Sequence, residues 1–234
     1  MPYQFKGRIR YSEVDEEHRL TLPGIVDYFQ DCSTFQSEEL GVGLDLMEKR
    51  KRAWILAYWQ IEIKRFPVLG EEVTTETWPY AFSGFMGERN FRMTDAKGEM
   101  LACANSIWVF MDVENGRIAK VDEDILNAYT LEKALPMEKG GRKVALPADC
   151  VQKDAFTVMR CHLDTNHHVN NGQYILMAEE YLPDHFEVHR VRVEYRKSAV
   201  LHDTVFPLTA EENGVYTVGL CDENRKPYAV VSFS

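Results

Sequence analysis

The amino-acid sequence predicts an α+β protein built from two tandem domains, each a curled antiparallel sheet wrapped around a central helix. Three observations lead to this class: residues 61–73 are repeated at 193–205, a helical pattern precedes each copy, and alternating strands accompany each helix. A helix with one apolar stripe and a set of antiparallel strands can bury both apolar surfaces if the sheet curls around the helix. A length of 234 residues fits two domains of about 110 residues.

The repeat agrees in content and in order. Residues 61–73 and 193–205 both read apolar, Glu, apolar or aromatic, two bases, and then Val-Leu and an acid, without a gap. A second match lies upstream, where Val14–His18 and Leu163–His168 both place an Asp and a His before a helical pattern. Agreement at two places in the same order favours duplication of one unit.

The helix of the first half is predicted at 22–39 and that of the second half at 173–182. The first has apolar residues at i, i+3, i+4 and i+7, with Thr21 as a cap, Pro23 in the first turn and Gly41 as a stop. The second has a similar stripe and ends at Pro183. Each half therefore has one helix that can pack on a sheet.

Alternating strands are predicted at 54–66, 71–80, 85–95, 99–112, 215–221 and 228–233. In 54–66 the odd positions from Ile55 to Ile63 form an apolar face, and we expect Tyr58, Gln60, Glu62 and Lys64 on the polar face. Turn sequences at 95–98 and 222–227 indicate antiparallel meanders. We therefore expect domains at 1–115 and 153–234, joined by a linker at 116–152 with a short helix near 122–130.

Composition excludes several functions. The chain is 45% hydrophobic and has a formal charge of −10, which argues against a nucleic-acid partner. The basic run 49–52 is interpreted as a solvated helix end, with a docking point for an acidic partner as the alternative. Five widely spaced cysteines indicate neither a disulfide framework nor a zinc site, and there is no membrane span or signal core. We expect a cytoplasmic protein with no membrane partner, cofactor or metal.

The densest polar cluster lies at residues 163–174, where a strand meets a helix. Asp164, Asn166 and His168 alternate there and provide a carboxylate, an amide and an imidazole beside the positive end of a helix dipole. Such a set could activate a water molecule against a thioester without a metal. The structural alternatives are a helix-capping Asn170 or Asn171, a surface His167, and an Asp164 that only braces the loop.

The segment 164–174 resembles the D-x-N-x-H-V-N-N-x-x-Y signature of acyl-acyl carrier protein (ACP) thioesterases, and Arg8–Asp15 and Tyr28–Ser33 are also similar to that family. The resemblance implies a tandem hot-dog fold, an acyl chain in the first domain and catalysis in the second. It also implies catalytic roles for Asp164, Asn166, His168 and, on a later strand, Glu194. Many relatives have a cysteine after that acid, whereas this sequence has Tyr195, so direct attack by water is expected.

The implied partner is an acyl carrier protein bearing a phosphopantetheine-linked acyl chain. Basic residues near the site could dock this acidic carrier, and the candidates are Arg190, Arg192, Arg196 and Lys197. Side chains expected to line the acyl cavity are Phe29, Trp54 and Trp59. A homodimer is left open. Three alternatives remain: an acyl-CoA thioesterase, a non-catalytic acyl-binding sensor, and a Glu194 that merely balances neighbouring arginines on its strand.

Overall fold

The computed structural model describes all residues, 1–234, and divides them into two compact units. The first contains residues 1–57 and 61–139, and the second contains residues 58–60 and 140–234. Each unit has an antiparallel sheet and a helix on one face, so the predicted α+β class and the duplicated arrangement are confirmed. No helix has both the length and the apolar character needed to cross a bilayer.

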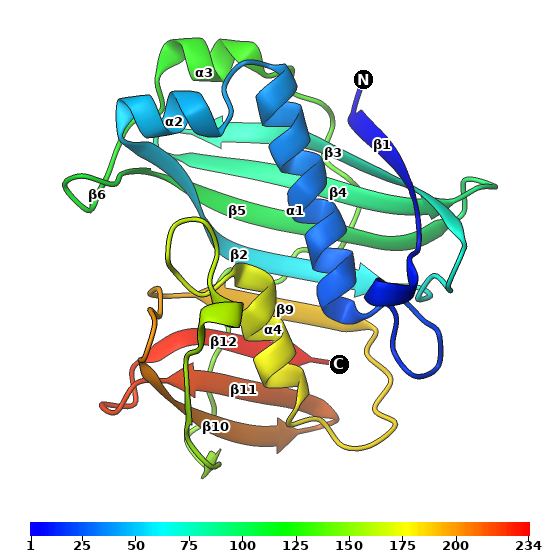
Figure 1. Ribbon diagram of the computed structural model, residues 1–234, viewed down its shortest axis with the longest axis vertical. Coiled ribbons are helices and arrows are strands. Elements are labelled where there is room, and N and C mark those ends of the chain that lie inside the picture. Colours follow the sequence, from blue (N-terminus) through cyan, green and yellow to red (C-terminus); the bar gives the residue numbers. More distant parts are fainter. The chain divides into compact units, whose positions relative to one another are not determined.

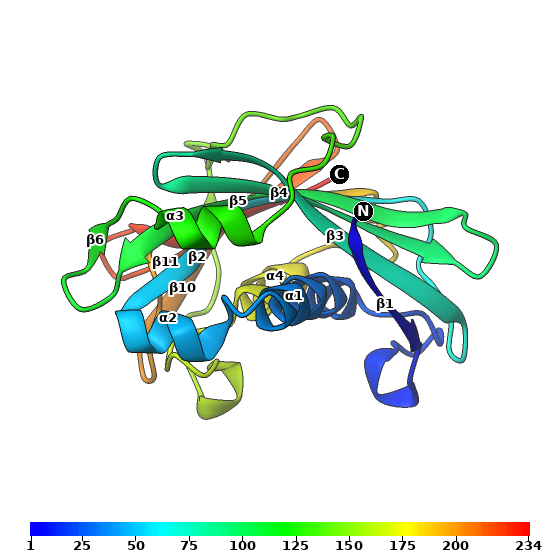
Figure 2. The same cartoon turned by 90° about the horizontal axis from the view of Figure 1, so that it is seen from above.

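In the first unit the sheet order is β1-β3-β4-β5-β2, and α1 packs on β3 and β1. Figures 1 and 2 show α1 lying along one side of this curved sheet. The elements are β1 (Tyr3–Arg8), η1 (Tyr11–Glu13), α1 (Leu22–Glu39), α2 (Leu44–Arg50), β2 (Arg52–Ile63), β3 (Glu72–Ser83), β4 (Met86–Asp95), β5 (Met100–Asp112), β6 (Arg117–Ile118) and α3 (Glu123–Ala128).

The helix α1 has the predicted bounds, because its signals at both ends are strong. The Thr21 hydroxyl accepts a hydrogen bond from the Gly24 N–H (3.2 Å), and Gly41 takes a positive φ just past the end. Leu22, Ile25 and Phe29 on the predicted stripe are at most 2% exposed. The apolar stripe is therefore the surface that α1 buries.

In the second unit the sheet order is β9-β12-β11-β10-β7, with β8 paired to β10. The helix α4 contacts β11 and β12 and lies across them in Figure 1. The elements are β7 (Val151–Gln152), β8 (Phe156–Thr157), η2 (Arg160–His162), α4 (Asn171–Glu179), β9 (Arg190–Tyr195), β10 (Thr204–Glu212), β11 (Val215–Cys221) and β12 (Pro227–Phe233).

The segment expected to be a linker, 116–152, is divided between the two units. Its first part belongs to the first unit, where Val121 and Ile125 pack into a core with Phe110 and Met47. The predicted short helix is present there as α3. The first domain therefore extends beyond residue 115, because the apolar side of α3 needs the sheet to cover it.

Residues 130–146 follow as an irregular strap, held to the sheets by side chains rather than by strand pairing. In the first unit the Trp78 indole donates to the Lys133 carbonyl (3.0 Å), and the Leu135 N–H donates to Asn90 Oδ1 (2.9 Å). In the second unit the Gly140 N–H donates to Gln60 Oε1 (2.8 Å). This explains why Tyr58 and Gln60, expected on a polar solvent face, are each only 1% exposed.

Candidate functional site

The polar cluster of the second unit forms a closed five-residue turn between η2 and α4. The Asp164 N–H donates to the His168 carbonyl (2.8 Å), and the His167 N–H donates back to the Asp164 carbonyl (3.1 Å). His167 adopts a left-handed conformation with φ 61°, which lets the chain reverse. The turn is therefore a defined structure, and we call residues 164–168 the second-unit loop.

Asp164 braces this loop from inside. Its Oδ1 accepts hydrogen bonds from the N–H groups of Asn166 (2.8 Å) and His168 (3.2 Å). The side chains of Asn166 and His168 are exposed and make no hydrogen bond or ion pair with the rest of the chain. The loop thus presents a free amide and a free imidazole, spaced by one residue, on a backbone fixed by a carboxylate.

The helix α4 begins directly after the loop. Asn170 is its N-cap, and its side-chain oxygen accepts from the Gly172 N–H (2.8 Å), as the capping interpretation predicts. The helix begins two residues earlier than its apolar pattern indicated because of this cap. Its N-terminal end places positive electrostatic potential next to His168.

A neighbour that the sequence pattern did not reveal lies beside the loop, namely residues 198–200. His168 forms a β-bridge with Val200, and the Val169 N–H donates to the Ala199 carbonyl (3.0 Å). The Ala199 N–H in turn donates to the Tyr174 hydroxyl (2.8 Å). The first unit has the corresponding bridge between Arg19 and Val68, and Val68 aligns with Val200 in the sequence repeat.

The hydrogen bonds of Glu194 go to groups outside the second-unit loop. Its neighbour Tyr195 points to the α4 side of the sheet, where its hydroxyl donates to the Asn171 carbonyl (2.9 Å). Because side chains alternate along a strand, Glu194 faces the other side, where it accepts from the Val144 N–H (2.9 Å) and from Arg196 Nη2 (2.9 Å). The expectation that Glu194 and the loop converge around one water therefore stays a prediction.

Three of the four bases considered for docking are committed to contacts within the unit. Arg192 donates to the Tyr58 hydroxyl (3.1 Å) and to the carbonyls of Gly141 and Lys143, so it holds the strap. Arg196 pairs with Glu194, and Lys197 pairs with Asp222 (2.5 Å).

In the first unit, Arg50 of the basic run 49–52 pairs with Asp122 and Asp124. That run does end α2, as interpreted.

The residues expected to line an acyl cavity are apolar neighbours of the core. Phe29 is fully buried against Phe91, with ring centroids 5.3 Å apart, in the first unit. Trp54 packs on Phe110 at 4.9 Å. Trp59 is also fully buried. Phe29 and Trp54 have the aromatic neighbours that suit an acyl chain, and the contact of all three residues with substrate stays a prediction.

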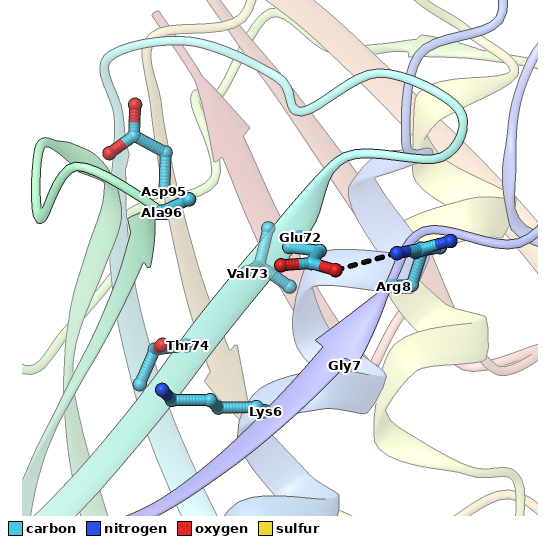
Figure 3. Close-up of a pocket in the computed structure, with 8 residues that line it drawn as sticks. All are labelled: Lys6, Gly7, Arg8, Glu72, Val73, Thr74, Asp95 and Ala96. Carbon is cyan, nitrogen blue, oxygen red and sulfur yellow. Dashed lines mark hydrogen bonds and ion pairs between the residues drawn. The ribbon is translucent and has the colours of Figure 1, made fainter.

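A surface hollow of about 480 Å³ lies on the first unit, between β1 and the end of β4 (Figure 3). Its walls include Lys6, Thr74 and Asp95, and an exposed ion pair joins Arg8 to Glu72 (2.6 Å). Polar and charged walls do not favour an alkyl chain. This hollow contains none of the predicted site residues and is separate from the second-unit loop.

Three of the five cysteines, Cys32, Cys103 and Cys221, are buried. Burial raises the pKa of Cys32 to about 12 and the pKa values of Cys103 and Cys221 to about 11, so these thiols stay protonated at neutral pH. Burial also raises the pKa of the Tyr195 phenol well above its ordinary value. No group of three or more His, Cys, Asp or Glu side chains is arranged to hold a metal ion.

Comparison with known proteins agrees with the tandem hot-dog class that the fold defines. The acyl-ACP thioesterase N-terminal domain matches residues 2–129, and the acyl-ACP thioesterase C-terminal domain matches residues 147–225. The chain therefore belongs to the acyl-ACP thioesterase family. The matched C-terminal domain contains the whole second-unit loop.

Individual relatives support the same assignment. Oleoyl-acyl carrier protein thioesterase 1 of Arabidopsis thaliana is 27% identical over 230 residues, covering 89% of this chain and 64% of the relative. The chain thus spans less than two thirds of that relative. The crystal structure of an acyl-ACP thioesterase from Bacteroides thetaiotaomicron has a TM-score of 0.89 at 20% identity, covering 98% of this chain and 96% of the other. The 12:0-ACP thioesterase from Umbellularia californica has a TM-score of 0.85 at 21% identity, covering 100% and 96%.

Proposed function

We propose that this protein hydrolyses the thioester of a fatty acyl group carried by acyl carrier protein, with water as the nucleophile. The observation that carries the proposal is the second-unit loop: a braced turn with a free amide and a free imidazole, inside the domain that matches the family's C-terminal domain. The Arabidopsis relative bears the name of an oleoyl-ACP thioesterase. We extend that substrate class, a long acyl chain on a carrier, to this chain.

In the proposed reaction His168 accepts a proton from water as the water oxygen attacks the thioester carbonyl carbon. Asn166 orients the water or the carbonyl through its amide, and Asp164 keeps both residues in place through their backbone N–H groups. The tetrahedral intermediate collapses with cleavage of the carbon–sulfur bond. The proton held by His168 passes to the departing pantetheine sulfur, which leaves a fatty acid and the free carrier thiol.

Glu194 has structural contacts in addition to the catalytic role predicted for it. Its carboxylate closes the strap onto the second sheet through Val144 and Arg196, on the face away from α4. Tyr195 replaces the cysteine found after the acid in many relatives, and a buried phenol that donates to Asn171 is no nucleophile. Hydrolysis therefore needs no covalent acyl-enzyme.

The decisive experiment measures hydrolysis of a ladder of acyl-ACPs and matched acyl-CoAs by the wild-type protein and by His168→Ala. We expect turnover of acyl-ACP at a higher kcat/KM than acyl-CoA, and a loss of about 100- to 10,000-fold in kcat for His168→Ala. Glu194→Gln, measured in parallel, tests the role predicted for this acid: unchanged kcat would leave it with its contacts to the strap alone. Full activity of His168→Ala would refute the site, and a preference for CoA would replace the carrier.

A further inference from the structure

The segment beside His168 is held in place by a tyrosine of the signature. Ala199 is fully buried, and its N–H donates to the Tyr174 hydroxyl (2.8 Å). Its carbonyl accepts from the Val169 N–H (3.0 Å), and the next residue, Val200, forms the bridge to His168. Tyr174 on α4 is thus one hydrogen bond from the backbone that pairs with the loop.

In the first unit the equivalent backbone segment pairs with its loop without a hydrogen bond from a tyrosine. Pro67 stands there in place of Ala199: its carbonyl accepts from the Leu20 N–H (2.8 Å), and Val68 after it bridges to Arg19. Proline has no N–H and needs no acceptor. The position equivalent to Tyr174 is Ile25, which is also fully buried. At this helix position a hydroxyl is therefore present only in the unit whose paired segment has an N–H to satisfy.

Two further contacts fix the tyrosine itself. Its ring meets Tyr195 edge-on at 5.8 Å between centroids, and the Tyr195 hydroxyl donates to the Asn171 carbonyl in the first turn of α4. Burial is the main cause that raises the pKa of Tyr174 to about 12, and Asp203 and Asp164 raise it further. The phenol is neutral at physiological pH, so its oxygen is an uncharged acceptor with one proton retained.

We propose that Tyr174 is the positioning residue of the site: by anchoring the Ala199 N–H it fixes residues 198–200 and, through them, the backbone of His168. This inference rests on the proposed hydrolase function. It gives the final tyrosine of the signature a physical task that is distinct from substrate contact. The same task predicts that Tyr174 and Ala199 are energetically coupled.

The test is a double-mutant cycle with Tyr174→Phe and Ala199→Pro. Tyr174→Phe leaves a buried N–H without an acceptor, and we expect kcat to fall by about tenfold, equivalent to about 1.4 kcal/mol, with KM changed less than about threefold. Ala199→Pro alone should also lower kcat, because the proline Cδ would replace the N–H and clash with the Tyr174 hydroxyl. The double variant has an apolar helix side chain and a proline at these two positions, as the first unit has with Ile25 and Pro67. Its kcat should therefore return to within about threefold of wild type.

A loss of activity must be separated from a loss of folding. Tyr181→Phe, which removes a hydroxyl just beyond the end of the same helix, is the control and should behave as wild type. Amide hydrogen exchange at Ala199 and Val169 should accelerate in Tyr174→Phe while the core strands stay protected. Unchanged kcat in Tyr174→Phe, or a double variant no faster than the slower single variant, overturns the inference. If the wild type hydrolyses no thioester, the proposed function fails, and the exchange rates still test the anchor.

Discussion

The loop before α1 and the loop before α4 have the same backbone hydrogen bonds but present different side chains. In the first, Asp15 Oδ1 accepts from the N–H groups of Glu17 (3.0 Å) and Arg19 (2.8 Å). In the second, Asp164 Oδ1 accepts from Asn166 and His168 in the same pattern. Both loops reverse at a histidine with a positive φ, namely 59° at His18 and 61° at His167.

The difference lies in what each loop presents. Arg19 forms ion pairs with Asp15 (3.4 Å) and with Glu17, so the charged groups of the first loop neutralise one another. The corresponding residues of the second loop, His168 and Asn166, have no such partners. Since the aspartate does the same work in both loops, its presence alone does not indicate catalysis. The amide and imidazole distinguish the second loop.

The largest expected effect comes from giving the second loop the side chains of the first. In Asn166→Glu/His168→Arg the new side chains can pair as Glu17 and Arg19 do, and no neutral base remains. We expect kcat on acyl-ACP to fall by at least about 100-fold. Thermal unfolding should stay within a few degrees of wild type, because the backbone bonds to Asp164 are kept. The reciprocal variant Glu17→Asn/Arg19→His should leave kcat unchanged, and retained activity in the first double variant would contradict the comparison.

An intermediate effect is expected from removing the shared aspartate. Asp15→Ala and Asp164→Ala each leave two backbone N–H groups without their acceptor, in loops that water can reach, at a cost of about 1–2 kcal/mol. Thermal unfolding should show similar decreases of roughly 2–8 °C for both. Only Asp164→Ala should also lower kcat.

Asparagine keeps the Oδ1 acceptor, so Asp15→Asn and Asp164→Asn should unfold close to wild type. A stability loss confined to one loop would show that the two sets of hydrogen bonds are not equivalent. A loss of kcat in Asp15→Ala would show that the first loop also takes part in the reaction.

The fold could be predicted largely from the sequence because its signals are local. Thr21 and Gly41 bound α1 where expected, and the strand β11 matches the predicted 215–221. The fate of residues 116–152 could not be predicted, because the strap is held by side chains distant in sequence, such as Trp78 and Gln60. Composition rich in Gly and Pro indicates irregular backbone but not the surface on which it lies.

The loop of the candidate site could be located from the sequence, whereas the side of the sheet that each residue of β9 faces could not. The cluster Asp164, Asn166 and His168 is contiguous, so one loop brings it together. Glu194 lies on β9, where shifting the register by one residue moves a side chain to the opposite face. The sequence shows a Glu between arginines but not which of Glu194 and Tyr195 meets α4. The hydrogen bond from Arg196 agrees with the alternative of a strand acid balanced by neighbouring arginines.

The smallest expected effect concerns two equivalent turns that pair with the two loops. The first turn is residues 68–71, beside the loop before α1, and the second is residues 200–203, beside the second-unit loop. Glu71 accepts from Arg65 at 2.7 and 2.9 Å and from the Val68 N–H at 2.9 Å, whereas Asp203 accepts from the Tyr228 hydroxyl (3.2 Å) and the Val200 N–H (3.0 Å). The hydrogen bonds from Arg65 are the main cause that lowers the pKa of Glu71. Only the first turn is thus stabilised by an ion pair that acid can remove.

A lowered folded-state pKa stabilises the protein above the unfolded value of about 4.3, and that stability is lost as pH falls through the folded pKa. The first unit of the wild type should therefore lose more stability between pH 6 and pH 3 than that of Glu71→Gln. The difference should be below about 1 kcal/mol, because Arg65 is 48% exposed and water screens the pair. Urea unfolding across this pH range, with Arg65→Gln expected to flatten the dependence equally, measures it. Parallel curves for wild type and both variants would show that the ion pair contributes nothing to the first turn.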